Sequence, residues 1–590
     1  MHSLSRFRNR LSILFFSAVF TTFSSFVFAQ NNTEPIRLNQ VGFYPKGQKI
    51  AVVLGEKHAT FELKNASSGK TVFKGKLSEP RTNQHSGKIS RIADFSGFAK
   101  PGKYLIAVPS LGKSAPFEIK EKVYKEVAAA SLKGFYYQRA SIDLPEKFAG
   151  KWARPAGHPD DKVMIHASAV SEGRVENAVI SSTRGWYDAG DYNKYIVNSG
   201  ITMGTLLSLY EDYPSFCENF LTNIPESNNG VPDLLDETLY NLRWMLTMQD
   251  PADGGVYHKL TNPRFDGMIM PDAAKNSRYV VQKNTIATLD FVAVMAQSAR
   301  IFKNFENKFP GLADSCVTAA VKGWQWAKQH PAILYRQDEM NKKFDPDVVT
   351  GAYGDRDSKD EWIWAAAEMC ALTKKPEYLK DIAFQADEPM PLPTWSQVKA
   401  LGYYTIIRFA EELKSDPALS ESLKTNVISF ADNLLIDLEK QPYHTVMGKS
   451  AKDYSWGSSS VAANQGIALL YAFKLTKNPK YVQAAQGNLD YLLGRNATGY
   501  CFLTGFGSKR IMHPHHRPSI ADGIVDPIPG LLSGGPNPGQ QDKCATYTSK
   551  FADESFTDDD CSYASNEIAI NWNAPIVYLA AALEALSERK

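Results

Sequence analysis

The period of the hydrophobic residues changes once along this chain, near residue 120, and the change divides it into two kinds of structure. Over residues 34–120, short apolar runs such as "KIAVVL" and "KYLIAVP" alternate with Gly, Pro, Asn and Ser, as strands joined by turns do. Seven such runs in fewer than 100 residues favour an immunoglobulin-like β-sandwich. The sequence therefore predicts a small all-β domain over residues 34–120, without cysteines and held by its apolar core.

Residues 121–590 show a helical period instead. Starting with Val123, Val127 and Leu132, apolar residues recur at helical spacing in about a dozen segments. Gly- and Pro-rich loops interrupt the series, notably at 181–195 and 497–566. The period does not distinguish a helical bundle from a barrel of helical hairpins. It does predict a mainly α domain over residues 121–590, with polar residues gathered in long loops, where functional residues are common.

Residues 1–29 have the pattern of a secretory signal peptide. Arg6, Arg8 and Arg10 precede the apolar run "LSILFFSAVF", and small residues end the segment at Ala29. We identify no other run that is long and apolar enough to span a bilayer, so we expect a secreted or periplasmic protein without membrane insertion. Loss of these three arginines would cancel the net charge of +3, and no dense basic run is present, so nucleic acid is not an expected partner.

The six cysteines are too few for a disulfide scaffold in a chain of 590 residues. They include no C-x-x-C pair, which leaves a cysteine zinc site or a redox motif without support. Cys544 and Cys561 flank a loop and are the most plausible disulfide pair in an oxidising compartment, with free buried thiols as the alternative.

Polar residues that could take part in catalysis or binding lie in three loop segments. "GWYDAGDYNKY" (185–195) places Asp188 and Asp191 three residues apart between aromatic residues. "GFGSKRIMHPHHRPS" (505–519) is rich in histidine, and "FTDDDCSYASNEIAINWNAP" leads to Glu567. The chain has no G-x-S-x-G and no H-E-x-x-H, so serine-hydrolase and zinc-protease chemistry is not indicated.

Carboxylate chemistry remains. Inverting glycoside hydrolysis needs a carboxylic acid and a carboxylate base about 6.5–9.5 Å apart, which separate segments must supply. Two separate segments supply carboxyl groups of the required kind: one carries Asp188 and Asp191, and the other carries Glu567. Taken alone, the pair of aspartates would equally fit a solvated surface turn.

The three segments, in this order, resemble the signature segments of glycoside hydrolase family 9. "GLLSGGPNPGQQD" between the last two also resembles that family, and residues from "RLNQVGF" to "FEIK" are similar to its N-terminal immunoglobulin-like domain. The resemblance implies an (α/α)6 helical toroid after an immunoglobulin-like sandwich. It also implies inverting cleavage of β-1,4-glucosidic bonds in cellulose, related β-glucans or cello-oligosaccharides, with no cofactor for the chemistry.

The resemblance assigns roles residue by residue. Asp191 would be the general base, Asp188 would help to hold the same water, and Glu567 would be the general acid. His515 and Arg517 would hydrogen-bond the sugar. The remaining expected substrate-site residues are a supporting aspartate and two aromatic residues beside the catalytic carboxylates: Asp558, Tyr192 and Trp572.

Two other functions stay open at this point. One is an exo-acting β-glucosidase or β-glucosaminidase on the same scaffold, which would act on short oligosaccharides. The other is a non-catalytic glycan-binding protein, although all three expected carboxylates are present.

A further acidic segment, "TGAYGDRDSKDEWIW" (350–364), has the oxygen ligands that calcium prefers. Its acidic residues would equally suit a solvated helix start, where they favour the helix dipole. The resemblance favours a structural calcium ion held by Asp355, Asp360 and Glu361.

Overall fold

The computed structural model describes residues 35–380, 382–413 and 417–588. The predicted signal peptide, residues 1–29, lies outside this part of the chain. The last strand of the N-terminal region ends at Ile119 and the first helix begins at Lys125, so the change from strands to helices follows the change in hydrophobic period.

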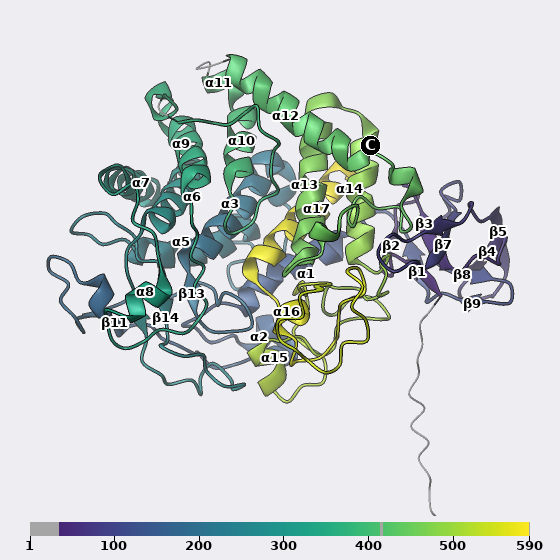
Figure 1. Cartoon of the computed structure of the whole chain (residues 1–590), viewed down its shortest axis with the longest axis horizontal. Helices are drawn as coiled ribbons and strands as arrows, with labels where there is room; N and C mark the ends of the chain where they lie inside the picture. Colours follow the sequence, from purple (N-terminus) through teal and green to yellow (C-terminus); the bar gives the residue numbers. More distant parts are fainter. Residues whose placement is uncertain (1–34, 381, 414–416, 589–590) are drawn as a thin grey trace, which may run out of the picture. The chain divides into compact units, whose positions relative to one another are not determined.

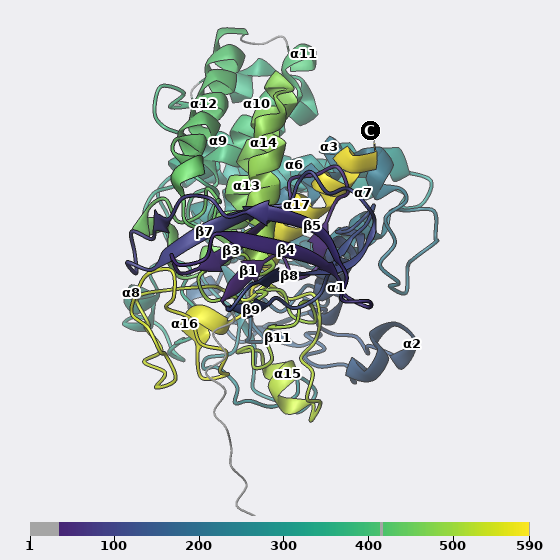
Figure 2. The same cartoon turned by 90° about the vertical axis from the view of Figure 1, so that its right-hand side faces the viewer.

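The N-terminal strands form two facing sheets, as a sandwich requires, and they face the viewer in Figure 2. Phe43 lies between them, with its ring centroid 5.3 Å from those of Phe95 and Phe117 in edge-to-face contacts. One sheet has the order β1 (Ile36–Leu38), β3 (Ile50–Leu54), β7 (Ile89–Asp94), β6 (Arg81–Thr82). The other has the order β2 (Gly42–Phe43), β10 (Phe117–Ile119), β8 (Gly102–Val108), β4 (Thr60–Asn65), β5 (Thr71–Lys76), with β9 (Gly112–Lys113) paired to β8.

Most of the long helices after residue 120 pack in a closed ring, drawn from blue to yellow in Figure 1, and the others pack against its members. Helix α3 packs against α6, α6 against α9, α9 against α10, α10 against α12, α12 against α13, α13 against α17, and α17 against α3. The predicted mainly α fold is confirmed. The long helices are α1 (Lys125–Tyr137), α3 (Ile196–Asp212), α5 (Asp233–Thr247), α6 (Thr285–Phe302), α7 (Leu312–Gln329), α9 (Lys359–Thr373), α10 (Lys399–Arg408), α12 (Pro417–Leu435), α13 (Ser458–Thr476), α14 (Pro479–Leu492) and α17 (Ile570–Glu588).

Helix α6 is a helix whose place in the domain cannot be predicted from a repeating apolar face. Almost all of its residues are buried, because both α3 and α9 flank it and α7 covers it from outside. Contrary to our expectation from the sequence, the stretch Thr285–Phe305 is long and apolar enough to cross a membrane by length and composition. Within the protein 94% of its apolar window is buried, as in the core helix of a helical domain.

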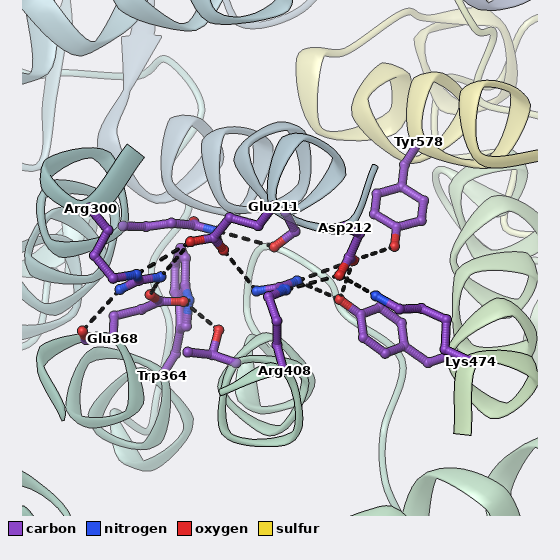
Figure 3. Close-up of polar contacts among 12 residues, drawn as sticks. Glu211, Asp212, Arg300, Trp364, Glu368, Arg408, Lys474 and Tyr578 are labelled. Carbon is purple, nitrogen blue, oxygen red and sulfur yellow. Dashed lines mark hydrogen bonds and ion pairs between the residues drawn. The ribbon is translucent and has the colours of Figure 1, made fainter. Parts of the chain in front are cut away.

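A buried ion network joins the helices of the ring at one end of α3 (Figure 3). The side chain of Asp212 is fully buried, and it accepts hydrogen bonds from Arg408 (2.9 Å) and from the hydroxyl of Tyr578 (2.6 Å). Its neighbour Glu211 binds Arg300 and Arg408, both at 2.9 Å. Burial would raise the pKa of Asp212, but the cations outweigh it and hold that pKa well below its usual range. The network therefore connects α3, α6, α10 and α17 through charges paired on several sides.

Short elements and long loops lie at the ends of these helices and carry the functional segments. A small sheet has the order β12 (Val179–Ile180), β11 (Val163–Ile165), β15 (Tyr279–Val280), β14 (Lys259–Thr261), β13 (Lys194–Tyr195). Strand β13 leads directly into α3, so it fixes the end of the loop that holds the two aspartates. The short helices are α2 (Glu146–Ala149), α4 (Pro214–Cys217), α8 (Gln337–Asn341), α11 (Ala410–Leu413), α15 (Arg517–Ala521) and α16 (Tyr563–Asn566).

Candidate active site

The loop with the two aspartates is locked to the histidine-rich segment. A Cβ at Gly190 would overlap the carbonyl oxygen of His515, so only glycine allows this approach. The Arg517 guanidinium donates to the Gly190 carbonyl at 2.8 Å, and the Arg517 backbone N–H donates to the same oxygen at 3.2 Å. Two segments far apart in the sequence thus become one structural unit.

Asp188 is almost fully buried and is held from two directions. It accepts hydrogen bonds from Asn198 Nδ2 at 2.8 and 3.0 Å and from the Tyr353 hydroxyl at 2.8 Å. Burial raises the pKa of Asp188, and the nearby charge of Asp191 raises it further. Asp188 therefore binds a proton more readily than an ordinary aspartate.

Asp191 lies beside it and is slightly more accessible, with 7% of its surface exposed against 1% for Asp188. It accepts hydrogen bonds from Asn193 Nδ2 at 2.5 Å and from the Tyr195 hydroxyl at 3.3 Å. Of the two aspartates, Asp191 is therefore the more accessible to a molecule in the cleft.

Glu567 follows α16 and reaches the same place from the C-terminal region. Its backbone forms a bridge with His515, and its carbonyl accepts the N–H of Gly534 at 2.9 Å. Its side chain is partly exposed in the cleft. Burial raises the pKa of Glu567 well above its usual range, and the charges of Asp191 and Asp188 add to this effect, while Arg517 opposes it. Glu567 therefore holds a proton more readily than an ordinary glutamate.

All three carboxylates line one cleft of about 930 Å³. Its walls carry aromatic side chains, including Tyr353 and Trp395 with ring centroids 5.2 Å apart. At the rim, Trp456 (45% exposed) and Tyr563 (36% exposed) lie 5.5 Å apart with their planes tilted by 32°. We call these two rings the aromatic ledge. A cleft with aromatic walls around an acid and a base suits a polar chain with apolar faces, as sugars have.

The other expected substrate-site residues lie in different positions. His515, Arg517 and Trp572 line the cleft, and Trp572 is 9% exposed. Asp558 lies behind it, where its carboxylate accepts the backbone N–H groups of Met512 and His513, both at 2.9 Å, which agrees with a supporting role.

Tyr192 corrects an expectation. Its side chain is buried in the protein interior instead of lining the cleft, and its hydroxyl donates to the Ile269 carbonyl at 2.6 Å. Its ring packs 4.8 Å from that of Tyr187. We therefore regard Tyr192 as a support of the loop and not as a sugar contact.

The sequence did not point to Tyr353 or Asn198, although both bind Asp188 directly. Asn198 lies in the first turn of α3, directly after the loop that holds the two aspartates, a position that could have indicated it. Tyr353 is in a left-handed backbone conformation (φ 43°), which is rare for an aromatic residue and turns its hydroxyl towards Asp188.

The predicted metal residues lie near one more carboxylate, Asp290 of α6, although in the described part of the chain no three of their oxygen atoms lie within 4.8 Å of one another. Burial and mutual repulsion raise the pKa of Asp290, Asp355, Asp360 and Glu361. Within the described part of the chain, neither carboxylate oxygen of the fully buried Asp290 has a hydrogen-bond partner, nor has Asp355 Oδ2. Unpartnered carboxylate oxygens are the type of ligand that calcium prefers, although here they are not gathered as closely as the ligands of one ion.

Cys544 and Cys561 form a disulfide, as predicted. The Asp559 carboxylate lies within 4.8 Å of both sulfur atoms, a grouping that could hold a metal ion only if the sulfurs were not bonded to each other. The disulfide closes the loop that leads to Tyr563 and Glu567. The other four cysteines are free and buried.

Comparison with known proteins agrees with this geometry. The family described as glycosyl hydrolase family 9 matches residues 124–580, and the cellulase N-terminal ig-like domain matches residues 31–113. The chain is 48% identical over 556 residues to a xyloglucan-specific endo-beta-1,4-glucanase of Bacteroides ovatus, with 94% of each chain covered. It is 34% identical over 549 residues to endoglucanase D of Acetivibrio thermocellus, covering 92% of this chain and 82% of that one. The solved structure of Bacteroides ovatus GH9 matches with a TM-score of 0.89 and 46% identity, over 94% of this chain and 99% of the other.

Proposed function

Because the chain belongs to glycosyl hydrolase family 9, we propose that Asp191, assisted by Asp188, and Glu567 carry out its chemistry. The protein is an inverting glycoside hydrolase of the endo-β-1,4-glucanase type. The observation that carries the residue assignment is the convergence of these three carboxylates in one aromatic-walled cleft.

In the proposed reaction, a water molecule lies between the two aspartates and the anomeric carbon. Asp191 accepts a proton from this water as its oxygen attacks that carbon, while Asp188 accepts a hydrogen bond from the second hydrogen, which stays on the new anomeric hydroxyl. Glu567 donates its proton to the glycosidic oxygen as the bond to the leaving sugar breaks. Attack from the face opposite the leaving group inverts the anomeric configuration. Side chains and water supply every proton in these steps.

For the substrate, we propose internal cleavage of β-1,4-glucan chains, with xyloglucan as the favoured polymer. The xyloglucan-specific relative at 48% identity supports this proposal. The rim of the cleft supports it as well, since Phe265 (47% exposed), Val349 (47%) and Trp456 (45%) offer apolar surface for sugar branches beyond the main chain.

Two further proposals concern the setting of the enzyme. The signal-peptide pattern of residues 1–29 supports export to the periplasm or the medium. The unpartnered oxygens of Asp290 and Asp355 support a structural calcium ion, with Asp360 and Glu361 as further ligands. Such an ion would neutralise the repulsion among these carboxylates and would take no part in bond cleavage.

The test is a proton NMR time course with cellotetraose and a xyloglucan oligosaccharide of two repeating units. We expect the α-anomer to appear first and products of intermediate size to dominate. Initial release of the β-anomer would refute the roles given to the aspartate pair. Stepwise release of one sugar from a chain end would instead support the exo-acting alternative.

A further inference from the structure

Residues 83–88 connect β6 and β7 of the immunoglobulin-like domain and contact two loops of the helical domain. One loop, residues 441–457, carries Trp456. The other, residues 548–563, carries Tyr563. These are the two rings of the aromatic ledge. Residues 83–88 therefore contact both of the loops that carry its rings.

The first contact meets the loop between two and eight residues before Trp456. His85 Nε2 donates to the Gly448 carbonyl at 2.8 Å, and Gln84 Nε2 donates to the Lys449 carbonyl at 2.9 Å. The His85 ring also meets the buried ring of Tyr454 edge-on, with centroids 5.3 Å apart. Tyr454 precedes Trp456 by two residues, so this contact fixes the backbone just before the exposed indole.

The second contact holds the other loop. Asn83 Nδ2 donates to Asp553 Oδ2 at 2.5 Å, and both side chains are buried. Lys88 forms an ion pair with Glu554 at 2.5 Å. From these residues the chain runs through the buried Phe556 and the disulfide at Cys561 to Tyr563.

We propose that residues 83–88 position the aromatic ledge and thereby belong to the substrate-binding apparatus. Both rings are substantially exposed, so little protein covers them, and their orientation depends on the backbone behind them. The inference rests on the proposed glucanase function, because it gives the ledge a sugar to bind. The residues act through Trp456 and Tyr563 and are positioning residues, not catalytic ones.

The test is His85→Ala, which removes the hydrogen bond to Gly448 and the contact with Tyr454. We expect the KM for xyloglucan to rise about 2- to 10-fold with kcat nearly unchanged, as for loss of a neutral hydrogen bond that serves binding alone. His85→Gln retains a donor and should recover part of the loss. In a Trp456→Ala background, His85→Ala should add nothing, because the ring that it positions is absent.

Tyr44→Phe is the matched control. It removes another hydrogen bond between the two domains, from the Tyr44 hydroxyl to Glu584 at 2.7 Å, at a place that neither ledge loop reaches. Its KM should equal that of the wild type. An unchanged KM in His85→Ala, an equal change in Tyr44→Phe, or additivity with Trp456→Ala would each overturn the proposal.

The same variants are compared by the dissociation constant for cellohexaose in the Glu567→Gln background. This measurement separates the two proposals. A wild type that cleaves no glucan refutes the proposed function, whereas weaker cellohexaose binding in His85→Ala still supports the role of residues 83–88. Equal binding refutes that role even when the wild type is fully active.

Discussion

Replacing Tyr353 by phenylalanine isolates one contact of the catalytic pair. The change removes a hydroxyl that donates to Asp188 Oδ2 at 2.8 Å and leaves the ring between Tyr195 and Trp395. This hydrogen bond favours the ionised form of Asp188, so its loss raises the pKa of Asp188 beyond the increase that burial and Asp191 already cause. Because a water between the aspartates must give up a proton, the acidic limb of the pH–rate profile should move to higher pH.

The size of this movement follows from the kind of bond that is lost. A hydrogen bond to a charged group contributes about 1.5–3 kcal/mol. Since a tenfold change in protonation corresponds to about 1.4 kcal/mol, the acidic limb of kcat/KM should move up by about 1–2 pH units. At a pH below the limb, activity should fall about 10- to 100-fold, and most of it should return as the pH is raised.

The assay is the pH dependence of kcat/KM for a soluble xyloglucan, measured by release of reducing ends. Tyr335→Phe is the control, because Tyr335 is also shielded from solvent (1% exposed) but its hydroxyl donates to the neutral amide of Gln337 at 3.1 Å. Its profile should match that of the wild type. A uniform loss in Tyr353→Phe at every pH, with the limb unmoved, would refute the argument and leave Tyr353 with a packing role only.

Three other predictions concern separate parts of the molecule. Glu567→Gln should lower kcat on glucans about 100- to 10,000-fold and much less on an aryl cellobioside whose acidic phenol leaves unprotonated. Asp212→Asn, measured by chemical denaturation, should lower the free energy of unfolding by about 3–5 kcal/mol, because Lys474 and Arg408 lose their shared carboxylate. Because the pKa of Asp212 is lower in the folded protein than in the unfolded chain, this carboxylate stabilises the fold above its unfolded pKa, and that stability is lost as the pH falls. Asp212→Asn should therefore lose less stability than the wild type on acidification. An equal loss in the two proteins would contradict this prediction. Calcium at 100 times its dissociation constant should stabilise the wild type by about 2.7 kcal/mol over EDTA, and Asp290→Asn should abolish the increase in melting temperature.

The fold was predictable because it depends on patterns that the sequence carries locally. Strands with turn residues between them and helices with a repeating apolar face are set by hydrophobic period, and both appear where the period indicates them. The closed ring was not readable from period, since α6 buries almost its whole surface and so lacks the polar face that would orient it. The same burial explains why its apolar stretch passes as a membrane span by composition.

The carboxylates of the site were predictable from the sequence, whereas the residues that hold and surround them were less so. Asp188, Asp191 and Glu567 stand in distinctive segments, and the structure brings them to one cleft. Tyr192 was wrongly expected to contact the sugar, because neighbouring residues in a loop can point in different directions. In the structure, Asp191 lines the cleft, whereas the Tyr192 side chain points into the protein interior. Asp290 was missed because a single acidic residue within the apolar run of α6 gives no sign of the loop that packs against it.

Tyr353 connects the chemistry with the acidic cluster that fits a cation. Its left-handed backbone conformation costs about 1–3 kcal/mol and persists only where the surroundings hold it. On its N-terminal side, the Val349 N–H donates to the Pro263 carbonyl at 2.8 Å. On its C-terminal side, Asp355 follows two residues later and lies in the repulsive cluster with Asp290. A cation bound there would hold this end of the loop, and with it the hydroxyl that favours ionisation of Asp188. With a cation bound, the acidic cluster would therefore be coupled to the aspartate pair through one strained residue, although the two would perform different tasks.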